Sequence, residues 1–283
     1  MSEPPDPLEI PGHIMRFWHA MDASFERVHP TWWGAVVTDS RFPDIWDVNY
    51  ARVDVGTEEL RADEVDRELL PALSAAGAST HHVVMFQPGS TSRLIVELEG
   101  RGLNLGWDLV MELDRSSASI GGAEVAEVER VEELAPGGEL WDGVKASLSL
   151  FGTRSSSATR QLLAIERDVM MPRGKRWFVV RDRAEAGAIV SIGALLMFGD
   201  FAYIDNIATF PHARRRGFAR AVTSVIVGET RSAGALSTWL LAEPGERGAV
   251  AMYEGLGFVA VGRVASTRGS IEVGAPPWLP SLD

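Results

Sequence analysis

Three consecutive arginines, Arg214, Arg215 and Arg216, stand directly before Gly217 and a mostly apolar segment with helical spacing. The first amides of a helix have no partner inside the helix and lie at the positive end of its dipole. A glycine at this point lets the backbone approach a ligand closely. We therefore predict a site for a phosphate or pyrophosphate group at the start of this helix. A solvated basic loop would explain the charge, but not its place between a strand and a helix.

The elements around this loop alternate between strands and helices through the second half of the chain. FAYIDNIATF (201–210) predicts the strand before the arginines, and the helix after them ends near Gly234. The second half as a whole predicts helices at 139–152, 156–171, 217–234 and 247–257, and strands at 175–183, 188–199, 201–210, 237–244 and 258–267.

The first half predicts a similar series of elements. Thr57 is the expected N-cap of one of its helices. A stretch rich in Ser, Gly and Glu, 115–138, predicts the boundary between the halves, with one edge strand inside it. The predicted helices cover 13–28, 57–77 and 90–102, and the predicted strands cover 31–39, 44–55, 81–88 and 104–114.

Two pairs of segments indicate an internal duplication. DIWDVNYARV (44–53) is similar to FAYIDNIATF (201–210), and ELEGRGL (97–103) is similar to MYEGLGF (252–258). The two pairs occur in the same order, with a long helix and a short apolar strand between them. We interpret this as the repetition of one α/β unit, although short apolar patterns also recur by chance.

Two motifs in the second half resemble the GCN5-related N-acetyltransferase (GNAT) family. RRRGFA (214–219) fits its R/Q-x-x-G-x-G/A motif, and AVAMYEGLGF (249–258) resembles its closing motif. The resemblance implies an α/β fold with a mixed central sheet flanked by helices, in two acyl-CoA N-acyltransferase (GNAT)-like units. The first half shows no R-x-x-G-x-A loop and has Leu98 where the second has Tyr253. We therefore expect a degenerate unit at 1–134 and an active unit at 135–283.

The resemblance also implies an N-acetyltransferase that passes the acetyl group of acetyl-CoA to a primary amine, with no covalent enzyme intermediate. Tyr253 would protonate the leaving thiolate, although it could be an ordinary half-buried aromatic residue. Asp205 is the first candidate for the general base, with a purely structural role as the alternative. Glu243 and Glu246 are alternative bases, and together with Asn206 they are candidates for contacting the acceptor. The implied acetyl-CoA-binding residues are Ile207, Ala208, Thr209, Arg214, Arg215, Arg216, Gly217, Phe218, Ala219 and Arg220.

Composition limits the other classes of function. The net charge of −12 disfavours a nucleic-acid binder, and the lack of cysteine excludes disulfides, thiolate catalysis and zinc–thiolate sites. The pair His81 and His82 has no spaced partner for a metal, so we expect none. No signal peptide or membrane span is recognisable, which predicts a cytoplasmic protein. We expect a monomer or a homodimer. A non-catalytic acyl-CoA-binding sensor is the alternative to an enzyme.

Overall fold

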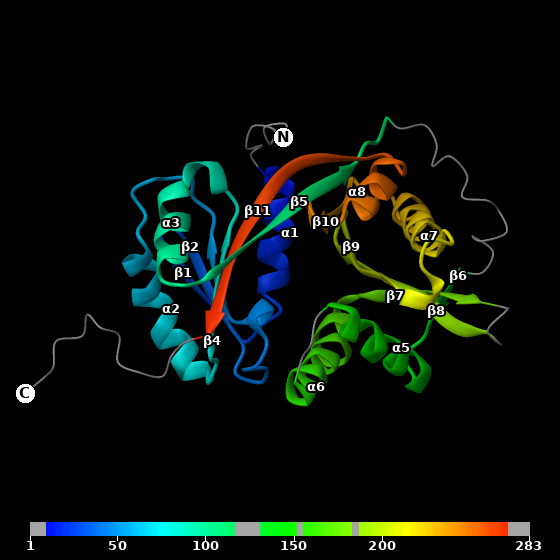
Figure 1. Cartoon of the computed structure of the whole chain (residues 1–283), viewed down its shortest axis with the longest axis horizontal. Helices are drawn as coiled ribbons and strands as arrows, with labels where there is room; N and C mark the ends of the chain where they lie inside the picture. The colour runs from blue at the N-terminus through cyan, green and yellow to red at the C-terminus, as the bar shows by residue number, and fades with distance from the viewer. Residues whose placement is uncertain (1–9, 117–130, 152–154, 183–186, 271–283) are drawn as a thin grey trace, which may run out of the picture.

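A computed structural model describes residues 10–116, 131–151, 155–182 and 187–270 of the chain. Within these ranges, eleven strands form one sheet in the order β1-β2-β3-β4-β11-β5-β10-β9-β8-β7-β6. Helices pack along this sheet in both halves of the chain (Figure 1). The predicted α/β fold with a mixed sheet flanked by helices is therefore confirmed.

The bounds of these elements are as follows. The strands are β1 Arg27–Thr31, β2 Gly34–Thr38, β3 Tyr50–Val53, β4 Thr80–Met85, β5 Asn104–Leu113, β6 Val131–Leu134, β7 Arg176–Asp182, β8 Ala188–Phe198, β9 Phe201–Thr209, β10 Ser237–Ala242 and β11 Phe258–Ser270. The helices are α1 Gly12–Asp22, α2 Ala62–Ala76, α3 Ser92–Gly100, α5 Gly138–Leu148, α6 Ser156–Ala164, α7 Phe218–Ser232 and α8 Arg247–Glu254. Short turns are η1 Trp46–Val48, the π-helical turn η4 Ile165–Met170 and η7 Pro211–Ala213.

The two halves repeat one arrangement of elements. In the first half, β3 and β4 pair in parallel and α2 connects them. In the second half, β9 and β10 pair in parallel and α7 connects them. Parallel neighbours need such a crossover, and α3 then β5, or α8 then β11, follow in the same order. Of the two similar segments, 201–210 forms β9, whereas only Tyr50–Val53 of 44–53 lies on the equivalent strand β3.

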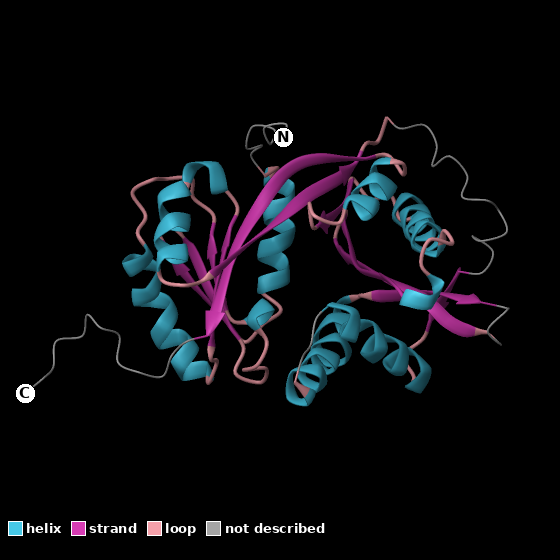
Figure 2. Ribbon diagram, in the orientation of Figure 1, coloured by secondary structure: helices cyan, strands magenta, loops and turns pink. Residues whose placement is uncertain are grey.

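The last strands of the two halves are exchanged. β5 lies between β10 and β11 of the second half, pairing antiparallel with both. β11 in turn lies between β4 and β5 of the first half, again antiparallel to both. Figure 2 shows these two long strands running side by side from one half to the other. Each half therefore completes its part of the sheet with a strand from the other half.

The alternation of side chains along β5 separates two cores on opposite faces of the sheet. Val110 enters a core that α1 and α6 cover, whereas Met111 enters a core that α7 and α8 cover. In the first of these cores, Phe17 of α1 packs against Tyr203 of β9 and Trp239 of β10, with ring centroids 5.8 and 5.3 Å away. A helix of the first half thus lies over the strands that should carry the site.

The first half departs from the predicted elements at its first two helices and at the strand predicted over 44–55, of which only Tyr50–Val53 is a strand, after the η1 turn. The helix predicted over 13–28 ends at Asp22, and the chain then turns into β1. The buried Asp22 carboxylate accepts a hydrogen bond from the Tyr50 hydroxyl (2.6 Å). Thr57 is not an N-cap: its hydroxyl accepts from the Glu59 amide at 3.1 Å, and α2 begins only at Ala62. The edge strand expected inside 115–138 is confirmed as β6, at one end of the sheet.

Candidate active site

The sheet opens between β9 and β10. Their parallel pairing runs from Phe201 opposite Ser237 to Ile204 opposite Leu240 and then stops. β9 continues to Thr209 with β8 as its partner on the other side. The β10-facing backbone groups of the last β9 residues are therefore not used by β10. Ile207, Ala208 and Thr209, the residues expected along a bound pantetheine, all lie on this part of the strand.

A bulge interrupts β9 at the same place. Ile192 pairs with Ala208 and Ala194 pairs with Asp205, so Asn206 and Ile207 together face one residue of β8. Asn206 has a φ of 53°, in the left-handed region that asparagine tolerates better than most residues. Bulges bend a strand and redirect its groups, often beside active sites. Here the bulge turns the backbone where the opening begins.

The Asp205 carboxylate belongs to a chain of three charges. Its Oδ2 accepts a hydrogen bond from Lys175 Nζ at 2.7 Å, and the same Nζ donates to Glu166 Oε1 at 2.8 Å. Both nitrogens of Asn206, backbone and side chain, donate to Asp205 at 2.8 Å. Asn206 thus fixes Asp205, while the Asp205 side chain keeps 30% of its surface exposed.

Sequence reasoning missed Lys175 and Glu166. Lys175 precedes β7, where a charged residue at the start of a strand is common. Glu166 gives a clearer signal, because it lies one helical turn from Leu162 and close to Val169 on an otherwise apolar stripe. Because a charge buried on such a stripe must be paired, this carboxylate predicts a buried cationic partner.

The arginine loop joins the end of β9 to α7 through η7. Arg215 has a φ of 66° and Gly217 a φ of 86°, so two residues adopt the left-handed region just before Phe218 begins the helix. The first intrahelical hydrogen bond runs from the Ala221 amide to the Gly217 carbonyl at 2.9 Å. The amides before Ala221 therefore lie at the free end of the helix. A β-carbon at Gly217 would meet nothing within 4 Å, so this position faces open space.

The arginine side chains brace the loop to different degrees. Arg214 Nε donates to the Thr209 carbonyl at 3.2 Å, and Arg216 forms an ion pair with Asp182 at 2.7 Å. Arg220 Nη2 donates to the Gly255 carbonyl at 3.0 Å and so links α7 to the end of α8. The Arg215 side chain is exposed. Of the two remaining expected residues, Phe218 is buried in the core below the loop and Ala219 is half-buried.

Tyr253 of α8 is buried, with 7% of its surface exposed, and its ring lies edge-on to Phe258. Burial, followed by the negative charge of Asp205, raises the pKa of Tyr253 to about 12. The phenol is therefore protonated at neutral pH. Because the charge of Asp205 acts on the Tyr253 phenol, the predicted base and the predicted proton donor belong to the same part of the site.

Acidic side chains from both halves surround the end of β10. Glu243 and Glu246 follow the strand and are exposed. Asp108 of β5 adjoins Leu109, which pairs with Ala242, and burial followed by the charge of Glu243 raises the pKa of Asp108. Asp108 was not predicted from the sequence, because its place beside β10 depends on the strand exchange.

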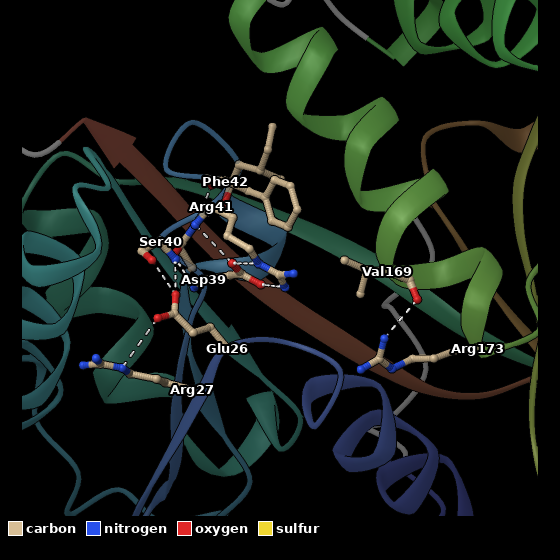
Figure 3. A network of polar contacts seen from close by, with 10 residues as sticks. Glu26, Arg27, Asp39, Ser40, Arg41, Phe42, Val169 and Arg173 are labelled. Carbon is tan, nitrogen blue, oxygen red and sulfur yellow. Dashed lines mark hydrogen bonds and ion pairs between the residues drawn. The ribbon is translucent and has the colours of Figure 1, made fainter.

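A loop of the first half docks on α6 of the second half. The Asp44 amide donates to Gln161 Oε1 of α6 at 2.9 Å, and Gln161 Nε2 donates to Asp44 Oδ2 at 2.8 Å. Within the loop, Asp39 binds the guanidinium of Arg41. Figure 3 shows this pair together with Arg173 of the second half, whose Nη1 donates to the Val169 carbonyl of η4. The docked loop carries η1, with Trp46 and Asp47, at its far end.

At the start of α2, the helix of the first half that corresponds to α7, backbone amides bind carboxylates of the same half. Glu97 of α3 accepts a hydrogen bond from the Ala62 amide at the start of α2 (3.0 Å), and Glu64 accepts one from the Arg61 amide (3.2 Å). The loop before α2 carries Glu58 and Glu59 where the second half has arginines. Both features oppose the binding of an anion at this helix.

The neighbouring histidines His81 and His82 of the first half make contacts that serve the structure. His81 Nε2 lies 2.7 Å from Asp66, and His82 Nδ1 lies 3.1 Å from the Trp46 carbonyl. Burial lowers the pKa of His82 to about 3. In the part of the chain that the structure describes, no three His, Cys, Asp or Glu side chains gather in a way that could hold a metal ion. In the same ranges, no helix has the length and hydropathy needed to cross a membrane.

Comparison with known proteins identifies the second half. Residues 146–258 match the family model of the acetyltransferase (GNAT) family. These residues are a GNAT acetyltransferase domain. The match covers β7 to β10, the arginine loop and α8, so it includes both sequence motifs. A search of curated proteins finds no match.

Solved structures extend the GNAT likeness to the whole fold. A GCN5-related N-acetyltransferase from Kribbella flavida has a TM-score of 0.59 at 13% identity, over 94% of this chain and 96% of that one. A tandem GNAT protein from the clavulanic acid biosynthesis pathway has a TM-score of 0.51 at 12% identity, over 79% of this chain and 75% of that one. A functionally unknown conserved protein from Staphylococcus epidermidis has a TM-score of 0.63 at 11% identity, over 84% of this chain and 90% of that one. These structural similarities show a fold of two GNAT-like units.

Proposed function

We propose that this protein transfers the acetyl group of acetyl-CoA to a primary amine, and that the second half performs the reaction. One observation carries the proposal: the bulge at Asn206 and the arginine loop before Gly217 lie on one continuous strand–loop–helix segment. The pairing of β9 with β10 ends at Ile204, immediately before the bulge. A single extended ligand with a carbonyl at one end and phosphates at the other fits this segment.

The loop and the strand would divide the binding of acetyl-CoA. The amides from Arg215 to Arg220 would hold the pyrophosphate, helped by the helix dipole and the arginine charges. The backbone of Ile207, Ala208 and Thr209 would bind the pantetheine. A donor near the bulge would polarise the thioester carbonyl and stabilise the negative charge that develops on its oxygen.

The reaction needs one proton acceptor and one proton donor. The ammonium form of the acceptor gives a proton to Asp205, and the neutral amine attacks the thioester carbon. The nitrogen gives up its second proton to solvent as the carbon–sulfur bond breaks, and the sulfur leaves as a thiolate towards Tyr253, to be protonated by water. A thiol pKa near 8.5 lies about 3.5 units below that of Tyr253, so full transfer of the phenol proton would cost about 5 kcal/mol. Tyr253 therefore acts mainly by donating a hydrogen bond to the departing sulfur.

The surroundings of Tyr203 support a cationic acceptor. Burial and then the charges of Asp205, Asp108 and Asp47 raise the pKa of this phenol well above its usual value. Negative charge from both halves thus acts on one place beside the bulge, where an ammonium group would be favoured. The docked loop and α1 also cover this face of the sheet, which favours a small amine over a folded protein substrate.

Calorimetric titration of the full chain with acetyl-CoA tests the proposal, followed by turnover assays with putrescine, tyramine and Nα-acetyl-lysine amide. Binding with turnover supports an acetyltransferase. Binding without turnover, extended to a wider set of amines, would favour the acyl-CoA sensor instead. A folded protein that binds no acetyl-CoA would contradict both.

Tyr253→Phe should lower kcat by about a hundredfold, because removing one hydrogen-bond donor from a charge that develops in the transition state typically costs at least this much. Its Kd for acetyl-CoA should stay within about twofold, since the phenol acts on the sulfur after bond breaking begins. Steady-state kinetics and calorimetry measure the two effects. Tyr50→Phe is the matched control: it removes a buried hydroxyl of the first half, bound to Asp22, and should leave kcat of the folded protein unchanged. Equal kcat for wild type and Tyr253→Phe would exclude this role.

The full chain should bind one acetyl-CoA, because Glu97 already occupies the helix start of the first half. The same calorimetric titration gives the stoichiometry. Glu97→Gln should lower stability by about 1–3 kcal/mol, since a charged hydrogen bond to the Ala62 amide is weakened, and the stoichiometry should remain one. Two acetyl-CoA molecules per chain would show that the first half is still a binding unit.

A further inference from the structure

Lys175 is the centre of a buried group of charges that runs from the core to the opening of the sheet. Its ammonium lies 2.8 Å from Glu166 Oε1 and 2.7 Å from Asp205 Oδ2. The side chains are 12% exposed for Glu166, 3% for Lys175 and 30% for Asp205. Only Asp205, at the bulge, can therefore meet a ligand from solvent.

A contribution to folding stability does not explain why this group of charges is buried. Taking three charges out of water costs several kcal/mol for each, and replacing such groups with apolar residues is often neutral or stabilising. Glu166 also keeps one buried oxygen, Oε2, without a hydrogen-bond partner among the described residues. It projects from η4, a turn of π-helix, and such turns occur frequently at functional sites.

The net charge of this group depends on how many carboxylates surround Lys175. Lys175 with Asp205 alone would be neutral, whereas the additional carboxylate of Glu166 gives the group one net negative charge. Burial would lower the pKa of Lys175, but Asp205 and Glu166 together outweigh it and raise that pKa, so the lysine stays protonated. Burial raises the pKa of Glu166, Lys175 opposes that rise, and the charge of Asp205 adds to it.

We propose that Glu166 and Lys175 are positioning residues that hold Asp205 at the bulge and keep it negative enough to take the proton of the amine. This inference rests on the proposed acetyl transfer. Lys175 fixes one oxygen of Asp205, and Glu166 shares the lysine charge so that it does not neutralise Asp205 completely. The proton passes from the ammonium nitrogen to Asp205 and later to solvent. Other titratable groups acting here are Tyr203 and Tyr253, which stay protonated, and the carboxylates of Asp108 and Asp47, which act on Tyr203.

Kinetic pH profiles of two variants should move in opposite directions. In Glu166→Gln, Lys175 stabilises the charge of Asp205 alone, so kcat should fall about tenfold and its acidic limb should move to lower pH. In Lys175→Met, the two carboxylates repel each other, so the acidic limb should move to higher pH. The Kd for acetyl-CoA should change less than about twofold in both. The double variant Glu166→Gln/Lys175→Met provides a folded protein if Lys175→Met alone does not fold.

A titration of the Glu166 carboxyl by ¹³C NMR tests the same coupling without an acceptor. The midpoint for Glu166 should rise in Lys175→Met and fall in Asp205→Asn, because Lys175 lowers it and Asp205 raises it. Asp66→Asn is the control, since Asp66 is a buried carboxylate of the first half paired with Arg101 and His81; it should lower stability and leave kcat and its pH profile unchanged.

The outcomes separate this inference from the proposed function. Wild-type protein that turns over an amine, with Glu166→Gln and Lys175→Met profiles that match it, would overturn the positioning role and leave the acetyltransferase standing. Wild-type protein that binds acetyl-CoA but acetylates no amine would overturn both. Shifts of the same sign in both variants would also overturn it, because a purely structural effect would not reverse with the sign of the removed charge.

Discussion

Gly217→Asp should bind acetyl-CoA at least about a hundredfold more weakly than the wild type. The new carboxylate would stand at the start of α7, in open space where we expect the pyrophosphate. Like charges brought together in a binding site cost several kcal/mol, and each 1.4 kcal/mol is a factor of ten in Kd. The variant should still fold, because aspartate tolerates a left-handed φ such as the 86° of Gly217 better than most residues. Calorimetry measures the binding and thermal unfolding measures the stability.

Two further variants test whether the effect of Gly217→Asp comes from the charge of the new side chain, from its bulk or from its position on α7. Gly217→Asn has nearly the same bulk and conformational cost without the charge, and should lose less than about tenfold in affinity. Gly228→Asp puts the same carboxylate on the same helix at an exposed position with open space around it, and should bind like the wild type. If folded Gly217→Asp keeps wild-type affinity, the arginine loop does not hold the phosphates.

Local patterns predicted the second half well. The strand 201–210, the helix after Gly217 and the helix at 247–257 appear as β9, α7 and α8 within a few residues. Their signals are hydrophobic periodicity and a glycine at a turn, which depend on neighbouring residues only. The Gly77 stop of α2, with a φ of 72°, follows from the same kind of signal.

Contacts between distant residues could not be predicted from these patterns. Lys175 meets Asp205 across 30 positions of sequence, and no local spacing joins them. The bulge at Asn206 is a property of the pairing with β8, not of the strand itself. The exchange of β5 and β11 is similarly invisible, because each strand alternates in the same way whichever neighbours it pairs with. The segment 115–138 differs from its surroundings in composition, but it does not divide the sheet, which continues across the two halves.

Residues 131–283 expressed alone should not form a stable protein and should not bind acetyl-CoA. Without β5, both β10 and β11 lose the strand that lies between them. Ala242 of β10 loses its partner Leu109, and Arg268 of β11 loses its partner Asn104. Helix α1, which packs Phe17 on Tyr203, would be missing as well. The exposed strand edges and apolar surface should lead to aggregation. Circular dichroism, thermal unfolding and calorimetry measure these losses.

The matched control is the same cut with both pieces present. Residues 1–116 and 131–283 produced together should assemble, because β5 can still insert between β10 and β11 while β11 inserts between β4 and β5. The assembled pair should bind acetyl-CoA with an affinity within about tenfold of the intact chain, since the arginine loop and the bulge are unchanged. A soluble, cooperatively unfolding 131–283 fragment with wild-type affinity would contradict this expectation. It would show that the exchanged strand adds stability without being needed to build the site, and that the division at 135 separates two independent units.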